Sequence, residues 1–148
     1  NSTTIRLAEH RNIIAIKDAT GDLARGKELI DAVGDKLDVL SGDDATAAEL
    51  MLLGGKGNIS VTANIAPAAV KAVCLAAMSG DKEATAAADA PLRILHDRLF
   101  VEANPIPVKW ALLAMGMMED GIRLPLTVLS EAAQPSVTEA LTQAGLLD

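Results

Sequence analysis

One stretch of the sequence decides the fold class: Ile13-Ile14-Ala15-Ile16-Lys17-Asp18-Ala19-Thr20-Gly21-Asp22. Its first four residues are a continuous apolar run rich in β-branched side chains, which is typical of a strand buried on both faces of a sheet. The turn-forming cluster 18–22 follows. The segment 23–33 then places Leu23, Ile30 and Val33 among charged residues, which predicts a helix with one exposed face. Strand, turn and helix in this order predict a βα unit.

The same order recurs twice along the chain. We predict strands at 37–40 and 58–62, and helices at 45–53 and 67–78. Gly34 is suited to end the first helix, because glycine readily adopts the left-handed conformation of a helix C-terminus. Three successive βα units predict an α/β fold with parallel strands joined by crossover helices.

After Gly80 the strand patterns stop. We expect helices at 81–100, 105–115 and 136–144, with Asn104 capping the second of them and an extended segment around Pro125. Three apolar parallel strands need cover on both faces and partners at both edges. The chain therefore reads as part of a larger sheet, with βα units in 1–80 and a helical domain in 81–148.

Composition excludes several classes of protein. Half of the 148 residues are hydrophobic and 22% are charged, which indicates a folded chain. The net charge of −7 argues against a surface for nucleic acid or anionic membranes. No apolar run is long enough to span a bilayer, and the single Cys74 cannot form an internal disulfide, which suits a cytoplasmic location.

Lys17 is the most informative candidate for chemistry. It follows the apolar run and should lie at the carboxyl end of a parallel strand, where active sites of such folds are found. A lysine held there loses hydration, so more of it is a free amine that can attack a ketone and form an imine. The alternative is that Lys17 only extends from a strand end into water.

The other polar candidates favour structural roles. Asp43 and Asp44 could hold a divalent cation, but we expect one to cap the following helix and the other to be solvated. His10 and His96 should be exposed helix residues, and Cys74 a small buried apolar residue. No metal site and no cofactor are predicted.

Two glycine- and apolar-rich stretches also favour structure over function. Gly54-Gly55-Lys56-Gly57 lacks the spacing of a phosphate-binding loop and should end a helix. Trp110 and Met115 should contribute to packing.

The opening stretch resembles the Schiff-base lysine segment of the pyruvate-dependent class I aldolase family related to N-acetylneuraminate lyase. Further stretches, in the same order, resemble the dihydrodipicolinate synthase (4-hydroxy-tetrahydrodipicolinate synthase) branch of that family. They are Leu40-Ser41-Gly42-Asp43-Asp44, Gly57-Asn58-Ile59-Ser60-Val61-Thr62-Ala63-Asn64, Leu99-Phe100-Val101-Glu102-Ala103-Asn104-Pro105-Ile106-Pro107-Val108-Lys109-Trp110 and Arg123-Leu124-Pro125.

The resemblance implies strands 6–8 of a (β/α)₈ TIM barrel, followed by a small C-terminal helical domain. It implies a lyase in which Lys17 forms an imine with pyruvate and the backbone carbonyl of Ile59 touches the bound pyruvate. The resulting enamine would add to L-aspartate 4-semialdehyde in lysine and diaminopimelate synthesis. A homotetramer is implied for the full-length form.

The sequence departs from the family's pattern in one respect. The family's proton relay uses a tyrosine and threonines of the first part of the barrel, and this chain has no Tyr. We therefore expect the 148 residues alone to be inactive. Two alternatives stay open: another pyruvate or keto-acid aldolase of the same superfamily, and a noncatalytic α/β interaction module.

Overall fold

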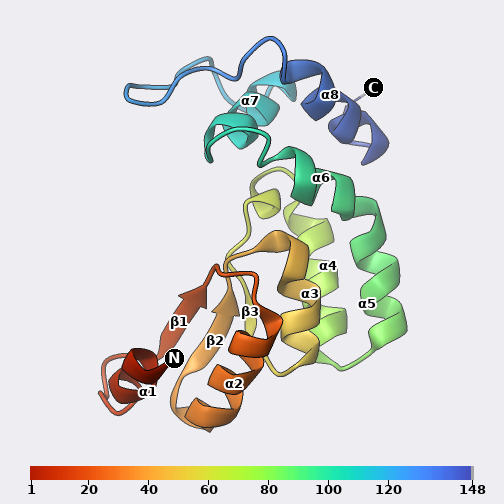
Figure 1. Ribbon diagram of the computed structural model, residues 1–148. Coiled ribbons are helices and arrows are strands. Elements are labelled where there is room, and N and C mark those ends of the chain that lie inside the picture. The colour runs from red at the N-terminus through yellow and green to blue at the C-terminus, as the bar shows by residue number, and fades with distance from the viewer. Residues whose placement is uncertain (148) are drawn as a thin grey trace.

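The structure is a computed structural model that describes residues 1–147 (Figure 1). Within that range the strands are β1 (Ala15–Asp18), β2 (Asp38–Ser41) and β3 (Gly57–Asn58). The helices are α1 (Ser2–Leu7), α2 (Leu23–Val33), α3 (Asp44–Leu52), α4 (Pro67–Met78), α5 (Lys82–Asp89), α6 (Arg93–Arg98), α7 (Ile106–Ala114) and α8 (Gln134–Gln143).

The βα alternation predicted for the first half is confirmed. The strands pair in parallel in the order β1-β2-β3, with Lys17 opposite Leu40 and Leu40 opposite Gly57. β1 begins two residues later than predicted, because its pairing with β2 starts at Ala15. Lys17 therefore lies within the strand, next to its last residue.

The third strand is much shorter than the prediction of 58–62. Only Gly57 and Asn58 pair with β2, and a 3₁₀ turn already begins at Thr62. Within residues 1–147, β3 has no strand on its other side that would extend its ladder.

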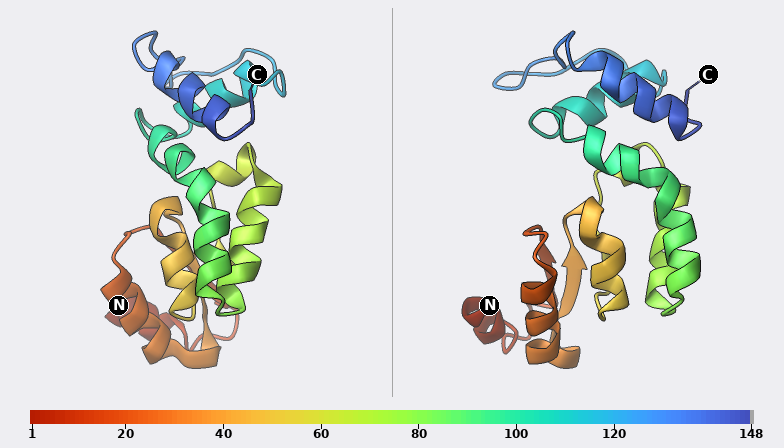
Figure 2. Two further views of the ribbon diagram at one scale, coloured as in Figure 1. Left: turned by 90° about the vertical axis from the view of Figure 1, so that its right-hand side faces the viewer. Right: turned by 45° about the vertical axis from the view of Figure 1, so that its right-hand side comes forward.

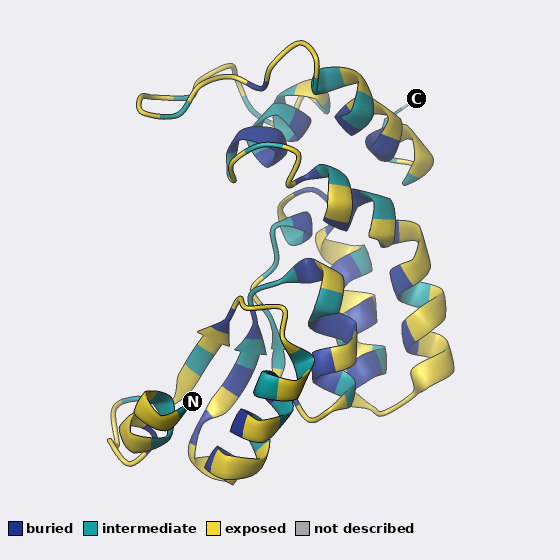
Figure 3. Cartoon of the chain, viewed as in Figure 1, coloured by how far each residue is buried: buried dark blue, intermediate teal, exposed yellow. Residues whose placement is uncertain are grey.

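Helices cover only one face of the sheet. Ile16 and Val39 point to that face and pack with Leu29, Val33 and Leu50 of α2 and α3. On the opposite face Ala15 and Lys17 are exposed, and Figure 3 shows β1 largely in the colours of exposed and half-buried residues. The expectation of a first strand buried on both faces is thus wrong for this chain, because nothing in the described range covers the second face.

The remaining helices form a second layer and a cap. α3 lies against the sheet, α4 packs on α3, and α5 packs on α4 (Figure 2). Helices α6 to α8 lie beyond the carboxyl ends of the strands (Figure 1). The largest core unites both parts, since Val70 and Val73 of α4 belong to the same cluster as Leu95 and Leu141. Whether 1–80 and 81–148 are separate domains stays a prediction.

Two details of the second half differ from expectation. The predicted helix 81–100 is interrupted by a 3₁₀ turn at Ala90–Leu92, because the proline at position 91 has no N–H for the helix ladder. Asn104 does not cap α7; Pro105 is the N-cap residue and Pro107 lies in the first turn.

Candidate active site

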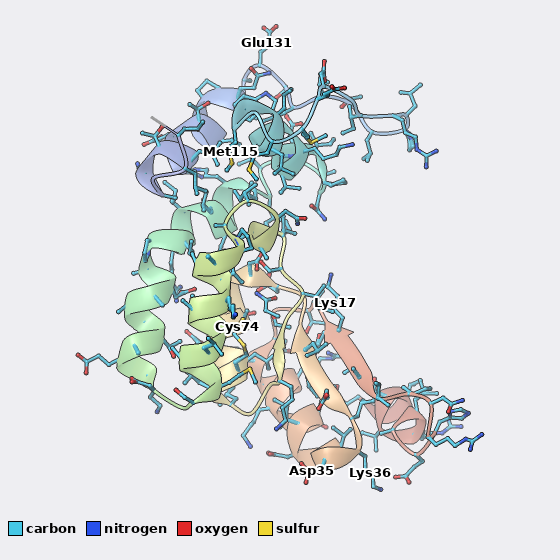
Figure 4. The ribbon with its side chains drawn as sticks, turned by 180° about the vertical axis from the view of Figure 1, so that it is seen from behind. Lys17, Asp35, Lys36, Cys74, Met115 and Glu131 are labelled. Atoms are coloured by element: carbon cyan, nitrogen blue, oxygen red, sulfur yellow. The ribbon has the colours of Figure 1, made fainter. Side chains whose placement is uncertain are left out.

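Lys17 lies near the carboxyl end of β1. Figure 4 shows it at the end of the sheet opposite Asp35 and Lys36, which mark the turn at the amino end of β2. This position is the one predicted from the sequence. Lys17 belongs to the same face as Leu40 and Gly57, the face that no helix covers.

The environment of Lys17 differs from the expectation of a dry site. Lys17 is exposed in this chain, because the uncovered face of the sheet leaves its amine open to water. Its stem lies over Gly42, where an added Cβ would come within 2.5 Å of the Lys17 Cε atom. The backbone just after β2 therefore forms one side of the lysine's surroundings.

The loop that follows Lys17 is held by the carboxylate of Asp18. This side chain is buried, forms an ion pair with Arg25 of α2 and accepts a 2.7 Å hydrogen bond from the Thr20 hydroxyl. The Asp18 carbonyl accepts a 2.8 Å bond from the Gly42 N–H. Helix α2 is capped separately by Asp22, which accepts from the Arg25 N–H. The segment 17–22 is thus fixed at both its ends.

Ile59, the predicted pyruvate contact, directly follows β3. Its N–H donates to the Ser41 carbonyl at 2.8 Å, which continues the line of strand pairing by one residue. Residues of parallel strands alternate between faces, so Ile59 shares the face of Gly57, and hence of Lys17. Its side chain is 47% exposed. The structure therefore brings Lys17 and Ile59 to one face and one end of the sheet.

Of the two neighbouring aspartates, only Asp43 has the role predicted for it. Asp43 caps α3, accepting from the N–H and the hydroxyl of Thr46. Asp44 is only 3% exposed, so the expectation of a solvated carboxylate is wrong. It accepts hydrogen bonds from the Asn58 amide and from the N–H groups of Val61 and Thr62.

The pKa of Asp44 reflects these contacts. Burial raises the pKa of the carboxyl, but hydrogen bonds from Ser60, Thr62 and Asn58 and the charge of His96 outweigh burial and hold the pKa below its usual range. The carboxylate is therefore charged at neutral pH.

His96 is buried, which corrects the prediction of an exposed helix residue. Its Nδ1 lies 2.8 Å from the Thr62 hydroxyl, and its Nε2 lies 3.3 Å from Asp89, which also pairs with Arg93. Burial alone would raise the pKa of Asp89. Hydrogen bonding to His96 and the charge of Arg93 lower the pKa by more than burial raises it, so the net shift is downward. The spacing of Asp89, Arg93 and His96 on one helical face was the sequence signal that could have indicated this cluster.

The other candidates have structural positions. His10 is exposed, and Gly54 adopts φ +114° where α3 ends, as predicted for a helix stop. Cys74, predicted as a small buried apolar residue, is half-buried, and burial is the main cause of the raised pKa of its thiol. Trp110 and Met115 pack against the largest core, as expected.

Residues 1–147 contain neither a metal-binding cluster nor a helix that could span a membrane. Across residues 1–147, no group of three or more His, Cys, Asp or Glu side chains is arranged to hold a metal ion. None of the helices described is both long and apolar enough to cross a membrane.

The sequence matches known proteins over almost its whole length. Residues 1–144 match the profile of the Dihydrodipicolinate synthetase family. The chain is 58% identical over 146 residues to the 4-hydroxy-tetrahydrodipicolinate synthase of Thioalkalivibrio sulfidiphilus, covering 99% of this chain and 50% of that protein. It is 58% identical over 145 residues to the synthase of Pseudomonas aeruginosa, again covering 50% of the relative.

Solved structures give the same result. The dihydrodipicolinate synthase of Acinetobacter baumannii, crystallised with pyruvate, superimposes with a TM-score of 0.97 at 55% identity, covering 99% of this chain and 50% of that one. The Aquifex aeolicus synthase gives a TM-score of 0.94 at 40% identity, covering 98% of this chain and 50% of that one. The chain thus spans about half the length of its relatives and has the fold of the corresponding part of their TIM barrels and C-terminal helices. It belongs to the dihydrodipicolinate synthetase family.

Proposed function

We propose that this chain supplies the imine-forming half of a 4-hydroxy-tetrahydrodipicolinate synthase, with Lys17 as the amine that captures pyruvate. The observation that carries the proposal is the place of Lys17: at the carboxyl end of a parallel strand, on the face it shares with Ile59, in a chain 58% identical to named synthases. Such strand ends are where βα folds place their active sites.

The proposed chemistry uses the amine as a nucleophile. The Lys17 nitrogen attacks the ketone carbon of pyruvate, and loss of water leaves a protonated imine. That imine draws electrons from the pyruvate methyl, which can then lose a proton to give an enamine. The enamine carbon bonds to the aldehyde carbon of L-aspartate 4-semialdehyde, after which the product cyclises. In this scheme the Ile59 carbonyl contacts pyruvate.

The exposure of Lys17 defines what the proposal still requires. The uncovered face must be closed for the amine to lose hydration. The relatives are about twice as long as this chain, so they contain a further segment of similar length. We propose that a further half of that kind completes the barrel and supplies the proton relay, since this chain contains no Tyr. A cytoplasmic location and a homotetrameric full-length enzyme belong to the same proposal.

Borohydride trapping tests the proposal. The full-length protein containing this chain is incubated with pyruvate and sodium borohydride. It is then digested, and the masses of the peptides are measured by mass spectrometry. We expect a gain of about 72 Da on the peptide containing Lys17, since reduction fixes the imine as a stable secondary amine. Lys36→Arg is a control variant that should give the same adduct as the parent protein, because Lys36 lies at the opposite end of the sheet from Lys17.

The alternatives give different results in the same experiment. Trapping on Lys17 without any turnover of L-aspartate 4-semialdehyde would favour another keto-acid aldolase of the superfamily. Absence of an adduct on Lys17, with Lys36→Arg and the parent behaving alike, would refute imine chemistry and favour the interaction module.

A further inference from the structure

We propose that Asp44 is a positioning residue that fixes the backbone turn 58–62 and thereby the Ile59 carbonyl that is to meet pyruvate. The inference rests on the proposed function and deepens it. Asp44 itself lies on the helix side of the sheet and would act on the substrate only through this turn.

The contacts of Asp44 enclose Ile59 on both sides. One carboxylate oxygen accepts from the Asn58 amide at 2.9 Å, immediately before Ile59. The other accepts from the N–H groups of Val61 and Thr62 at 2.9 and 3.0 Å, shortly after it. A single buried side chain therefore holds the chain upstream and downstream of the proposed contact, and so sets the path of the peptide units between them.

The backbone of Ile59 is itself arranged for a ligand. Its N–H is bonded to the Ser41 carbonyl at 2.8 Å, so that end of the residue is fixed to β2. In the part of the chain that the structure describes, no donor bonds the Ile59 carbonyl oxygen. The carbonyl is thus free for a substrate, and its direction depends on the peptide units that Asp44 anchors.

A carboxylate is suited to this task in a way that an amide is not. Both oxygens of Asp44 accept from donors, and hydrogen bonds to an ionised acceptor are shorter and stronger than neutral ones. An asparagine at this position would turn an NH₂ group toward Asn58 or toward the N–H groups of the turn. The ionised acceptor would be lost, so the hydrogen bonds that hold the turn would weaken even where the Asn58 amide rotates to accept from the new NH₂ group.

The turn is also held from the far side. The Thr62 side chain is completely buried, and its hydroxyl lies 2.8 Å from His96 Nδ1. His96 in turn contacts Asp89, which links the turn to α5 and α6. These contacts of His96 fix Thr62 but do not flank Ile59. We therefore expect them to contribute to stability without affecting the binding of pyruvate.

The test compares Asp44→Asn with two controls in the full-length enzyme. For Asp44→Asn we expect the KM for pyruvate to rise by roughly tenfold or more, while kcat and the KM for L-aspartate 4-semialdehyde change by less than about threefold. Asp81→Asn makes the same chemical change at the exposed N-cap of α5 and should alter neither constant. Asp89→Asn should lower the melting temperature while leaving the KM for pyruvate within about twofold of the parent.

A second variant covers the case in which Asp44→Asn does not fold. Asn58→Ala removes the hydrogen bond from the Asn58 amide to Asp44, and the Asn58 Oδ1 atom that it also removes has no partner in the described chain. The KM for pyruvate should then rise by about two- to fivefold. An unchanged KM in the folded variants, or an equal rise in Asp89→Asn, would overturn the inference.

Borohydride trapping on the same preparations separates the two proposals. If the parent enzyme traps pyruvate on Lys17 and Asp44→Asn has an unchanged KM, the positioning role fails and the proposed function stands. If the parent traps no pyruvate on Lys17, the proposed function fails, and the positioning role fails with it.

Discussion

The stem of Lys17 occupies the space that a side chain at position 42 would need. A Cβ added to Gly42 would lie 2.5 Å from Lys17 Cε, 2.8 Å from Lys17 Cγ and 2.9 Å from Ala19 Cβ, all closer than carbon atoms normally approach. The φ angle of Gly42 is not positive, so the requirement for glycine is one of space. Gly42, the residue that directly follows β2, therefore leaves room for the stem of the proposed nucleophile.

Replacing Gly42 by alanine should therefore displace the lysine amine. We expect Gly42→Ala in the full-length enzyme to slow imine formation by tenfold or more, since misplacing a reacting group by about 1 Å costs about 10²-fold. The rate of pyruvate trapping by borohydride measures this directly. Gly121→Ala is the matched control, because a Cβ there meets nothing within 4 Å. Equal trapping rates in the two variants would contradict the steric argument.

The buried carboxylates Asp44 and Asp89 should make stability depend on pH in the acid range. Both have pKa values below those of an unfolded chain, about 3.9 for Asp. Below that value the unfolded state binds more protons than the folded state. Their contribution to stability is therefore fully present above the unfolded pKa and is lost as the pH falls through the lowered folded pKa.

Chemical denaturation at a series of pH values from about 6 down to about 2.5 measures this dependence. The double variant Asp44→Asn/Asp89→Asn should be less stable at neutral pH and should lose less stability on acidification than the parent. Asp81→Asn, at an exposed helix cap, should follow the parent curve. Parallel curves for the parent and the double variant would show that neither carboxylate titrates differently on folding.

The sequence was sufficient to predict the elements that depend on local pattern. The helix 23–33 and the glycine stop at Gly54 follow from periodicity and backbone preference, and both are confirmed. The apolar run before Lys17 correctly predicted a strand, but β1 begins two residues later and is not buried on both faces. The position of Lys17 at a strand's carboxyl end follows from the same pattern.

The features that were missed depend on contacts between distant residues. Asp44 is bonded to residues 14 to 18 positions away, and His96 to Thr62, 34 positions away. A charged residue after a capping aspartate is usually exposed. We expected the same of a histidine with charged neighbours on a helix, so local pattern favoured the wrong answer for both. Local pattern also left open whether Lys17 loses hydration or extends into water, since burial of a strand face depends on what packs against it.

Helix α8 should be a major source of stability for the C-terminal helices. Leu141 has no exposed surface and packs in the largest core with Leu95 and Val137. Leu141→Ala should reduce the free energy of unfolding by about 2–5 kcal/mol, the usual cost of such a cavity. Leu124→Ala, at a side chain that is 81% exposed, should change it by less than about 0.5 kcal/mol. Denaturant unfolding followed by circular dichroism distinguishes the two; similar losses would mean that α8 is not anchored through Leu141.

The 148 residues prepared alone should show no synthase turnover and should self-associate. Turnover should be absent because Lys17 is open to water and the chain has no Tyr to relay protons. Association is expected because β1 is an edge strand of the sheet that residues 1–147 form and the adjacent Ile14 is 72% exposed, and such edges pair with other chains. A condensation assay and size-exclusion chromatography over a range of concentrations measure both. Ile14→Lys should shift the elution toward the monomer, since a lysine beside an edge strand opposes pairing, whereas Leu75→Lys on α4, 62% exposed but remote from that edge, should not. A stable monomer with measurable condensation activity would show that the uncovered face needs no second half.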